Sequence, residues 1–191
     1  MTQKTQVQQA TTRVAMFVRT LVNDIGGFAA VEFAMIVPVM IIMLLGSVEV
    51  SDALTVDGRV NIIADSVSDM VARSPSVSSK DLKDLMRISD ALIGKYSRQS
   101  LSIEIVSLTF NAGTNQMEVD WSYNSNGAQP YAHGATYPGA WDNMVSGANS
   151  LIISKAKYVY SSPVGQYIHG NITLNHLASY ASRQGLVVKT P

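Results

Sequence analysis

The chain has 191 residues, enough for one ordinary domain with an anchoring segment but not for two full domains. Lysine and arginine together number 14, as do aspartate and glutamate, and this balance argues against a nucleic-acid-binding protein, which normally carries a basic face. The chain contains no cysteine, which excludes disulfides, thiolate catalysis and cysteine-based zinc sites.

A long apolar run near the N-terminus is the most informative segment. Residues Phe28 to Val48 read FAAVEFAMIVPVMIIMLLGSV, and Glu32 is the only charged residue among them. A helix of this length covers about 30 Å, the hydrocarbon thickness of a lipid bilayer. We therefore predict a transmembrane helix over residues 28–48. The alternative is a secretory signal peptide, which would have a shorter apolar region and a small-residue cleavage site, whereas Ser47–Ser51 is acidic.

The charges on either side of this run predict its orientation. Lys4, Arg13 and Arg19 precede it, opposed only by Asp24. Between the run and Arg73 the only cation is Arg59, whereas five residues are acidic. The acidic residues are Glu49, Asp52, Asp57, Asp65 and Asp69. By the positive-inside rule, residues 1–27 are expected in the cytoplasm and residues 49–191 on the outer side of the membrane.

Two features of this segment are unusual for a plain anchor, namely Glu32 inside the apolar run and Gly26-Gly27 just before it. A carboxylate inside a membrane helix costs a few kcal/mol, so Glu32 is either retained for a partner or marks the headgroup boundary. Position alone does not decide between these readings. Pro38 lacks a backbone donor and predicts a kink or a loosened turn in the helix, although membrane helices tolerate proline readily.

Residues 26–38, GGFAAVEFAMIVP, resemble the opening of TadE-like proteins, the minor pseudopilins of the tight-adherence (Tad, or Flp) pilus system. In that pattern small residues lead into Val-Glu-Phe-Ala and an apolar stretch with an early proline. A weaker similarity recurs near the C-terminus, where residues 157–165, 172–174 and 181–183 follow a pattern of a tyrosine-containing strand, a proline turn and a last strand ending near an arginine.

The resemblance implies a function and its partners. A prepilin peptidase would remove residues 1–27 as a leader by cutting between Gly27 and Phe28, with Glu32 five residues beyond the cut. Phe33 stands where the major pilin usually has tyrosine, which suits a minor component. The implied partners are that peptidase, other pilins and pseudopilins contacted through the membrane helix, the inner-membrane assembly platform and the lipid bilayer. The resemblance also implies that the chain lies in the bacterial inner membrane, with residues 49–191 in the periplasm, and that the mature subunit is incorporated in a pilus. The alternative function is an unprocessed, membrane-anchored extracytoplasmic scaffold or binding protein.

Past the membrane, apolar residues at helical spacing predict that the first helix continues as a stalk to about Arg73, with Gly58 as a weak point. These residues are Val56, Val60, Ile63, Val67 and Met70. A break is predicted over 74–79, after which Ser78 and Asp81 match a capping box. The second helix is predicted to bury the face formed by Leu85, Ile88, Leu92 and Tyr96.

Strands are predicted after the second helix. Residues 101–110 and 117–123 form a hairpin around a turn at 111–115, and residues 151–160 and 171–182 add two strands joined by a turn at 163–165. The segment 124–140 reads as a surface loop. Its tyrosines Tyr131 and Tyr137, with the nearby Trp141, either contact another subunit or pack onto the sheet. The prediction is an α+β fold, with a long first helix, a second helix and a small antiparallel sheet, as in pilin-like subunits.

Nothing in the sequence predicts catalysis or a cofactor. The histidines His133, His169 and His176 have no metal-ligand spacing, and no nucleophile or phosphate-binding motif is present. Asp57, Asp65 and Asp69 lie on a predicted helix rather than in a calcium loop, so we interpret them as a solvated helix face. The chain is predicted to be neither an enzyme nor a metal-binding protein.

Overall fold

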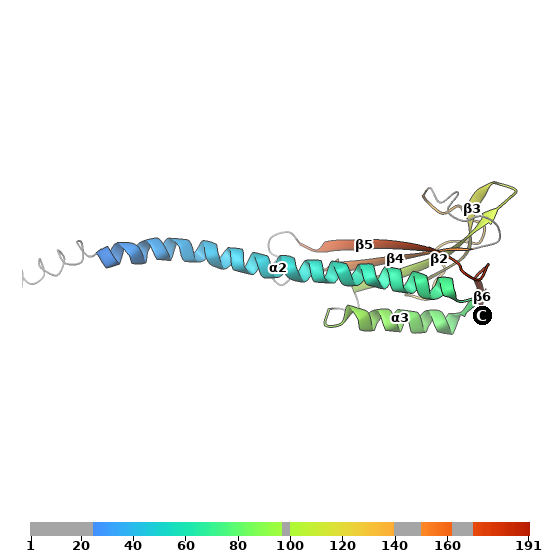
Figure 1. The fold of residues 1–191 in the computed structure, drawn as a ribbon, viewed down its shortest axis with the longest axis horizontal. Coiled ribbons are helices and arrows are strands. Elements are labelled where there is room, and N and C mark those ends of the chain that lie inside the picture. Colours follow the sequence, from blue (N-terminus) through green and yellow to red (C-terminus); the bar gives the residue numbers. More distant parts are fainter. Residues whose placement is uncertain (1–24, 97–99, 140–149, 162–169) are drawn as a thin grey trace, which may run out of the picture. The chain divides into compact units, whose positions relative to one another are not determined.

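The computed structural model describes residues 25–96, 100–139, 150–161 and 170–191 (Figure 1). Contacts divide the chain into an N-terminal unit, Met1–Val48, and a C-terminal unit, Glu49–Pro191. The elements in chain order are α2 (Ile25–Arg73), β1 (Ser76–Ser78), α3 (Ser79–Ile93), β2 (Leu101–Asn111), β3 (Gln116–Asn124), β4 (Leu151–Tyr160), β5 (Ile172–Ala181) and β6 (Val188–Thr190). The predicted turn at 163–165 lies outside the described residues. So do most of the predicted cytoplasmic segment and Trp141.

The α+β prediction is confirmed. Helix α2 ends at Arg73, as the spacing predicts, and four antiparallel strands form one sheet in the order β3-β2-β4-β5. A second, two-stranded sheet pairs β1 with β6 in parallel. The sequence does not reveal this pair, because strands of three residues are too short to show alternation.

The core of the C-terminal unit lies between the helices and one face of the four-stranded sheet. Figure 1 shows α3 and the second half of α2 on the same side of that sheet. Five apolar residues of α2 at three- and four-residue spacing are essentially inaccessible to solvent: Val56, Val60, Ile63, Val67 and Val71. Val71 takes the place predicted for Met70, which is 36% exposed. The stalk part of α2 is therefore one wall of the core.

Two buried hydroxyls join α2 to the sheet. Ser68 Oγ donates to the carbonyl of Ile152 on β4 at 2.9 Å, and Ser154 Oγ donates to the carbonyl of Ala64 on α2. Both serines have no exposed surface. Because each hydroxyl has a carbonyl partner, burying it leaves no unsatisfied donor, and the small side chains allow helix and strand to approach closely.

Helix α3 begins as predicted but buries only part of the predicted face, since Leu85 and Tyr96 pack against the core. Ser78 Oγ accepts from the Asp81 amide at 3.2 Å, and the Asp81 carboxylate accepts from the Ser78 amide at 2.8 Å, which completes the capping box. Hydrogen bonds from Ser78 lower the pKa of the Asp81 carboxyl. The fully buried residues are Leu82, Ser89 and Ile93. The prediction was wrong for Ile88 and Leu92, which are 46% and 38% exposed.

The end of α3 is fastened to α2 by an arginine. Arg59 Nη1 donates to the carbonyls of Leu92 and Ile93 at 3.1 and 3.3 Å, and its guanidinium lies 5.7 Å from the ring centroid of Tyr96. Gly94 ends the helix with φ of 69°, and a Cβ there would meet Arg59 Nη1 at 2.5 Å.

We expect Gly94→Ala to lower the free energy of unfolding by about 1–3 kcal/mol, because it strains the backbone and displaces the arginine from both carbonyls. The matched control is Gly58→Ala inside α2, where an added Cβ meets nothing within 4 Å. That change should stabilise the helix by up to about 1 kcal/mol. Urea unfolding of the full chain in detergent, followed by tryptophan fluorescence, measures both. Equal effects would contradict the assigned role of Gly94.

The loop after β3 packs onto the other face of the sheet. Tyr137 is 6% exposed and meets Tyr131 edge-on, with ring centroids 5.1 Å apart. Both belong to a second apolar cluster with residues of β2, β3 and β4. Of the two predicted roles for these tyrosines, packing onto the sheet is confirmed.

Burial of Tyr137 predicts a loss of stability in alkali. Desolvation raises the pKa of its phenol from 10.0 to about 12. A group whose pKa is raised by folding contributes stability below its unfolded value, and this stability is lost as pH rises from about 10 to about 12. We expect the wild-type chain to lose stability over this interval and Tyr137→Phe to lose less. Thermal unfolding of both chains at about pH 9, 10, 11 and 12 measures this loss. An equal loss of stability in the wild-type chain and in Tyr137→Phe would show that the Tyr137 phenol is not its cause.

Candidate functional site

The N-terminal unit exposes an apolar helix with no polar face. Within α2 the most apolar window has a mean hydropathy of 2.5, and none of it is buried. Large side chains such as Phe33 and Met43 are 66% and 70% exposed. Exposed apolar surface of this extent is unstable in water. Among the described residues, α2 is the one helix long and apolar enough to cross a membrane, which makes the chain a single-pass membrane-type protein.

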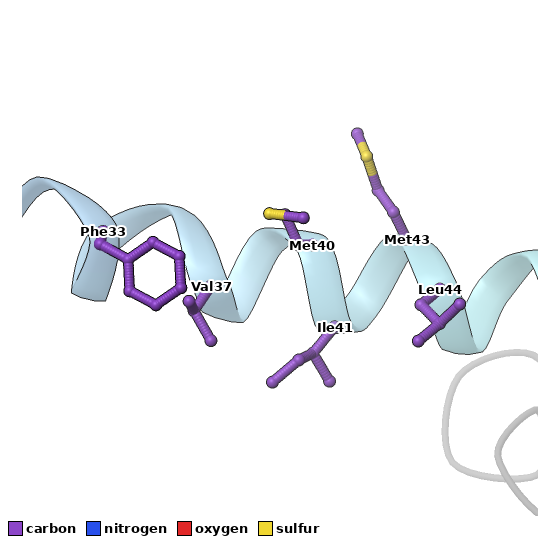
Figure 2. A pocket seen from close by; sticks show the side chains of 6 residues that line it. All are labelled: Phe33, Val37, Met40, Ile41, Met43 and Leu44. Carbon is purple, nitrogen blue, oxygen red and sulfur yellow. The ribbon is translucent and has the colours of Figure 1, made fainter.

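A shallow apolar hollow lies against this helix, and Figure 2 shows the side chains that line it. Six apolar side chains line the hollow: Phe33, Val37, Met40, Ile41, Met43 and Leu44. Val37, Ile41 and Leu44 project from the same side of the helix. All six belong to α2, so the hollow is open. Ridges and grooves of this kind accept the side chains of a second helix, and in lipid such packing drives helix association.

Glu32 is the charged group of this surface. Its side chain is exposed, and no ion pair to it occurs within the described residues. It lies four residues after Phe28, so the two side chains share one face of α2. An unpaired carboxylate inside a bilayer costs a few kcal/mol, and the exposed side chain of Glu32 is accessible to a group outside the chain.

The predicted cleavage position lies in the first turns of α2. The helix begins at Ile25, so the Gly27–Phe28 bond is helical, and a Cβ on Gly27 would meet nothing within 4 Å. Pro38 lies inside α2, which is assigned as helix from Ile25 to Arg73. The roles assigned to Gly27, Phe28, Glu32, Phe33 and Pro38 remain predictions.

The acidic residues of the stalk are not simply solvated. The distance between Asp57 Oδ1 and His176 Nε2, on β5, is 2.7 Å. Asp69 binds Arg73 and lies 3.6 Å from Arg183, and the hydrogen bond from Arg73 lowers the pKa of the Asp69 carboxyl. Both carboxylates stay in contact with solvent, with side chains 41% and 24% exposed, so the predicted solvated face also carries ion pairs to β5 and to the segment after it.

The histidines that the structure describes are bound to acidic residues or their backbone. His133 Nδ1 lies 2.8 Å from the carbonyl of Asp120, and His176 pairs with Asp57 as described above. His169 lies outside the described residues. In the described parts of the chain, no three histidine, aspartate or glutamate residues gather as metal ligands.

Comparison with known proteins gives one match, and it covers the helical segment. A family model described as "TadE-like protein" matches residues 27–73, which includes the hollow, Glu32 and the stalk part of α2. The resemblance seen in residues 26–38 is thereby confirmed for this segment. Comparisons with curated proteins and with solved structures gave no match.

Proposed function

We propose, from the TadE-like match of residues 27–73, that this chain is a minor pseudopilin that takes part in assembly of a Tad pilus. TadE-like proteins are pilus components, so a Tad pilus association follows from the match itself. The observation that carries the finer proposal is Glu32, an exposed carboxylate within an otherwise apolar helix of that family. The role is structural, with no catalysis by this chain.

The chemistry of Glu32 suggests how subunits are held in register. Cleavage after Gly27 would create an α-amine at Phe28. That amine on one subunit and the Glu32 carboxylate on a neighbouring helix could neutralise each other in low dielectric. Removing one partner of such a buried pair costs about 3–5 kcal/mol, because the remaining charge is left without compensation. The apolar hollow would supply the packing surface on which the pair forms.

The start of α2 is suited to processing. The first turn of a helix has amide groups without intrahelical partners, and each glycine costs about 1 kcal/mol relative to alanine inside a helix. Gly26 and Gly27 therefore make this turn easy to open, so that a prepilin peptidase at the inner membrane could reach the bond before Phe28. The other proposed partners are pilins, pseudopilins and the inner-membrane assembly platform. The C-terminal unit is proposed to lie in the periplasm.

The proposal is tested by the mass and N-terminal sequence of the membrane-embedded chain, expressed with and without its cognate prepilin peptidase. We expect a mature chain that begins at Phe28 only when the peptidase is present. An intact N-terminus in both samples would overturn processing after Gly27.

The second candidate function is an unprocessed, membrane-anchored scaffold or binding protein. It is favoured by the helical conformation of the Gly27–Phe28 bond within α2, since a peptidase must first unwind that turn. This candidate requires the intact N-terminus in both samples and stable membrane residence.

A further inference from the structure

The two edges of the four-stranded sheet differ in protection. At the β3 edge the following loop binds both backbone groups of Val119, whose amide donates to the Ala135 carbonyl at 2.9 Å and whose carbonyl accepts from the Gly134 amide at 2.8 Å. Thr136 forms a further bridge to Glu118. Strand β3 also carries the charges of Glu118 and Asp120. This edge is therefore closed to another strand.

The β5 edge, defined as the side of Ile172–Ala181 away from β4, has none of these protections among the described residues. The strand has no proline, lysine, arginine, aspartate or glutamate. Its ten residues pair with β4 without a bulge. Ile172 and Leu177 are 47% and 48% exposed. Proteins usually block long edge strands with charges, proline, bulges or covering loops, because an open edge pairs with other chains.

We propose that the β5 edge binds an extended segment of a different subunit, which adds a fifth strand to the sheet. The subunit's place beside this chain rests on the proposed function in pilus assembly. Main-chain hydrogen bonds would provide the affinity, and the side chains facing the two sides of the sheet would select the segment.

A second copy of this chain does not fit the β5 edge. Strand β5 runs parallel to the stalk part of α2, because His176 contacts Asp57 near its start and Arg183, just past its end, approaches Asp69. A two-fold antiparallel β5 pair would reverse the partner's α2, and the Glu49 ends of the two stalks would point in opposite directions. The β5 strand of a second copy would also bring no acidic side chain to this edge, in either direction, although Lys155 and Lys157 are exposed beside it. Pairing β5 with the β3 edge of another copy is blocked by the loop.

Two lysines on the strand next to β5 indicate which charge the added segment should carry. Lys155 and Lys157 are exposed on β4, opposite Leu177 and Asn175 of β5. Neither lysine forms an ion pair within the described residues, although Glu104 of β2 lies across from Lys155. An added strand would lie two strand spacings, about 10 Å, from β4, which long side chains bridge. The segment is therefore expected to be acidic on this face, and apolar on the opposite face, where Ile172 is exposed.

The test uses the full-length chain in detergent and two synthetic peptides. One is acetylated Thr-Val-Glu-Val-Glu-Val-Thr, and the other has lysine in place of both glutamates. Hydrogen–deuterium exchange should slow at residues 172–181 with the acidic peptide and not with the basic one. Leu177→Glu should weaken this protection about tenfold by placing like charge beside the peptide. The matched control is Ile88→Glu on α3, where the original residue is 46% exposed, and it should leave protection unchanged.

Several outcomes would overturn the inference. They are absence of protection at β5, equal protection by both peptides, or peptide-free protection that grows with protein concentration, which would indicate a second copy. If Leu177→Glu does not fold, Asn175→Glu on the same face replaces it. The test requires neither cleavage nor a pilus. Failure of cleavage after Gly27 therefore counts against the proposed function alone, and failure of peptide binding counts against the β5 edge alone.

Discussion

Replacement of Glu32 by alanine is expected to leave the chain inserted in the membrane but to abolish its incorporation into a pilus. The apolar window of α2 becomes more apolar without the carboxylate, so insertion should not suffer. The mature N-terminal amine of a neighbour would lose its partner, and an uncompensated buried charge costs about 3–5 kcal/mol. A loss of that size lowers the assembled fraction by more than about a hundredfold.

The measurement compares membrane and sheared pilus fractions from cells that carry the variant as the sole copy. Two controls separate charge from general damage. Glu32→Asp keeps the carboxylate and should retain part of the incorporation. Asp84→Ala removes an exposed carboxylate from α3 and should behave as wild type. Normal incorporation of Glu32→Ala would rule out pairing between the Glu32 carboxylate and the N-terminal amine of a neighbouring subunit. Glu32 would then be interpreted as a marker of the headgroup boundary.

Features formed by neighbours in sequence were predictable. The capping box depends on two residues three positions apart, and the extent of α2 depends on apolar spacing along a single helix. The four longer strands likewise follow from alternation and composition within each segment. The surface of α2 that the family model matches was visible for the same reason, since its apolar run and Glu32 lie within one continuous segment.

The buried face of α3 was predicted only in part, because the helix carries two overlapping apolar rows and only Leu85 and Tyr96 of the predicted row pack against the core. The residues that enter the core are Leu82 and Ile93, and the polar Ser89 lies between them. Ser89 is tolerated there because its hydroxyl donates to the Leu85 carbonyl at 2.9 Å, which satisfies the donor within the helix. A hydrophobicity pattern counts this serine against the correct face.

Contacts between distant segments were also missed. Asp57 and His176 are 119 residues apart, and Trp121 Nε1 donates to the carbonyl of Val187 across 66 residues. The β5 edge is of this kind, because it exists only once strand order is known. Sequence alone identified a strand over 171–182 but could not place it at an edge or show that β3, at the other edge, is covered.

The largest expected loss of stability comes from Ile63→Ala in the stalk part of α2. Ile63 has no exposed surface and belongs to the main core cluster, where α2 packs with residues of the sheet and α3. Truncating a buried isoleucine to alanine costs about 2–5 kcal/mol, through lost burial and the cavity that remains. For a unit of this size the melting temperature should fall by roughly 10 °C.

The neighbouring residue provides a matched control, because Ile62 is 56% exposed on the same helix. Ile62→Ala makes the same chemical change, leaves no cavity and improves helix propensity by a few tenths of a kcal/mol, so its melting temperature should remain within about 2 °C of wild type. Thermal unfolding of both full-length variants in the same detergent compares their melting temperatures with that of the wild type. A large loss for Ile63→Ala alone would show that the stalk is an integral wall of the C-terminal unit. Equal losses for the two variants would mean that α2 does not present this face to the sheet. The parallel course of α2 and β5, which depends on the same packing, would then fail as well.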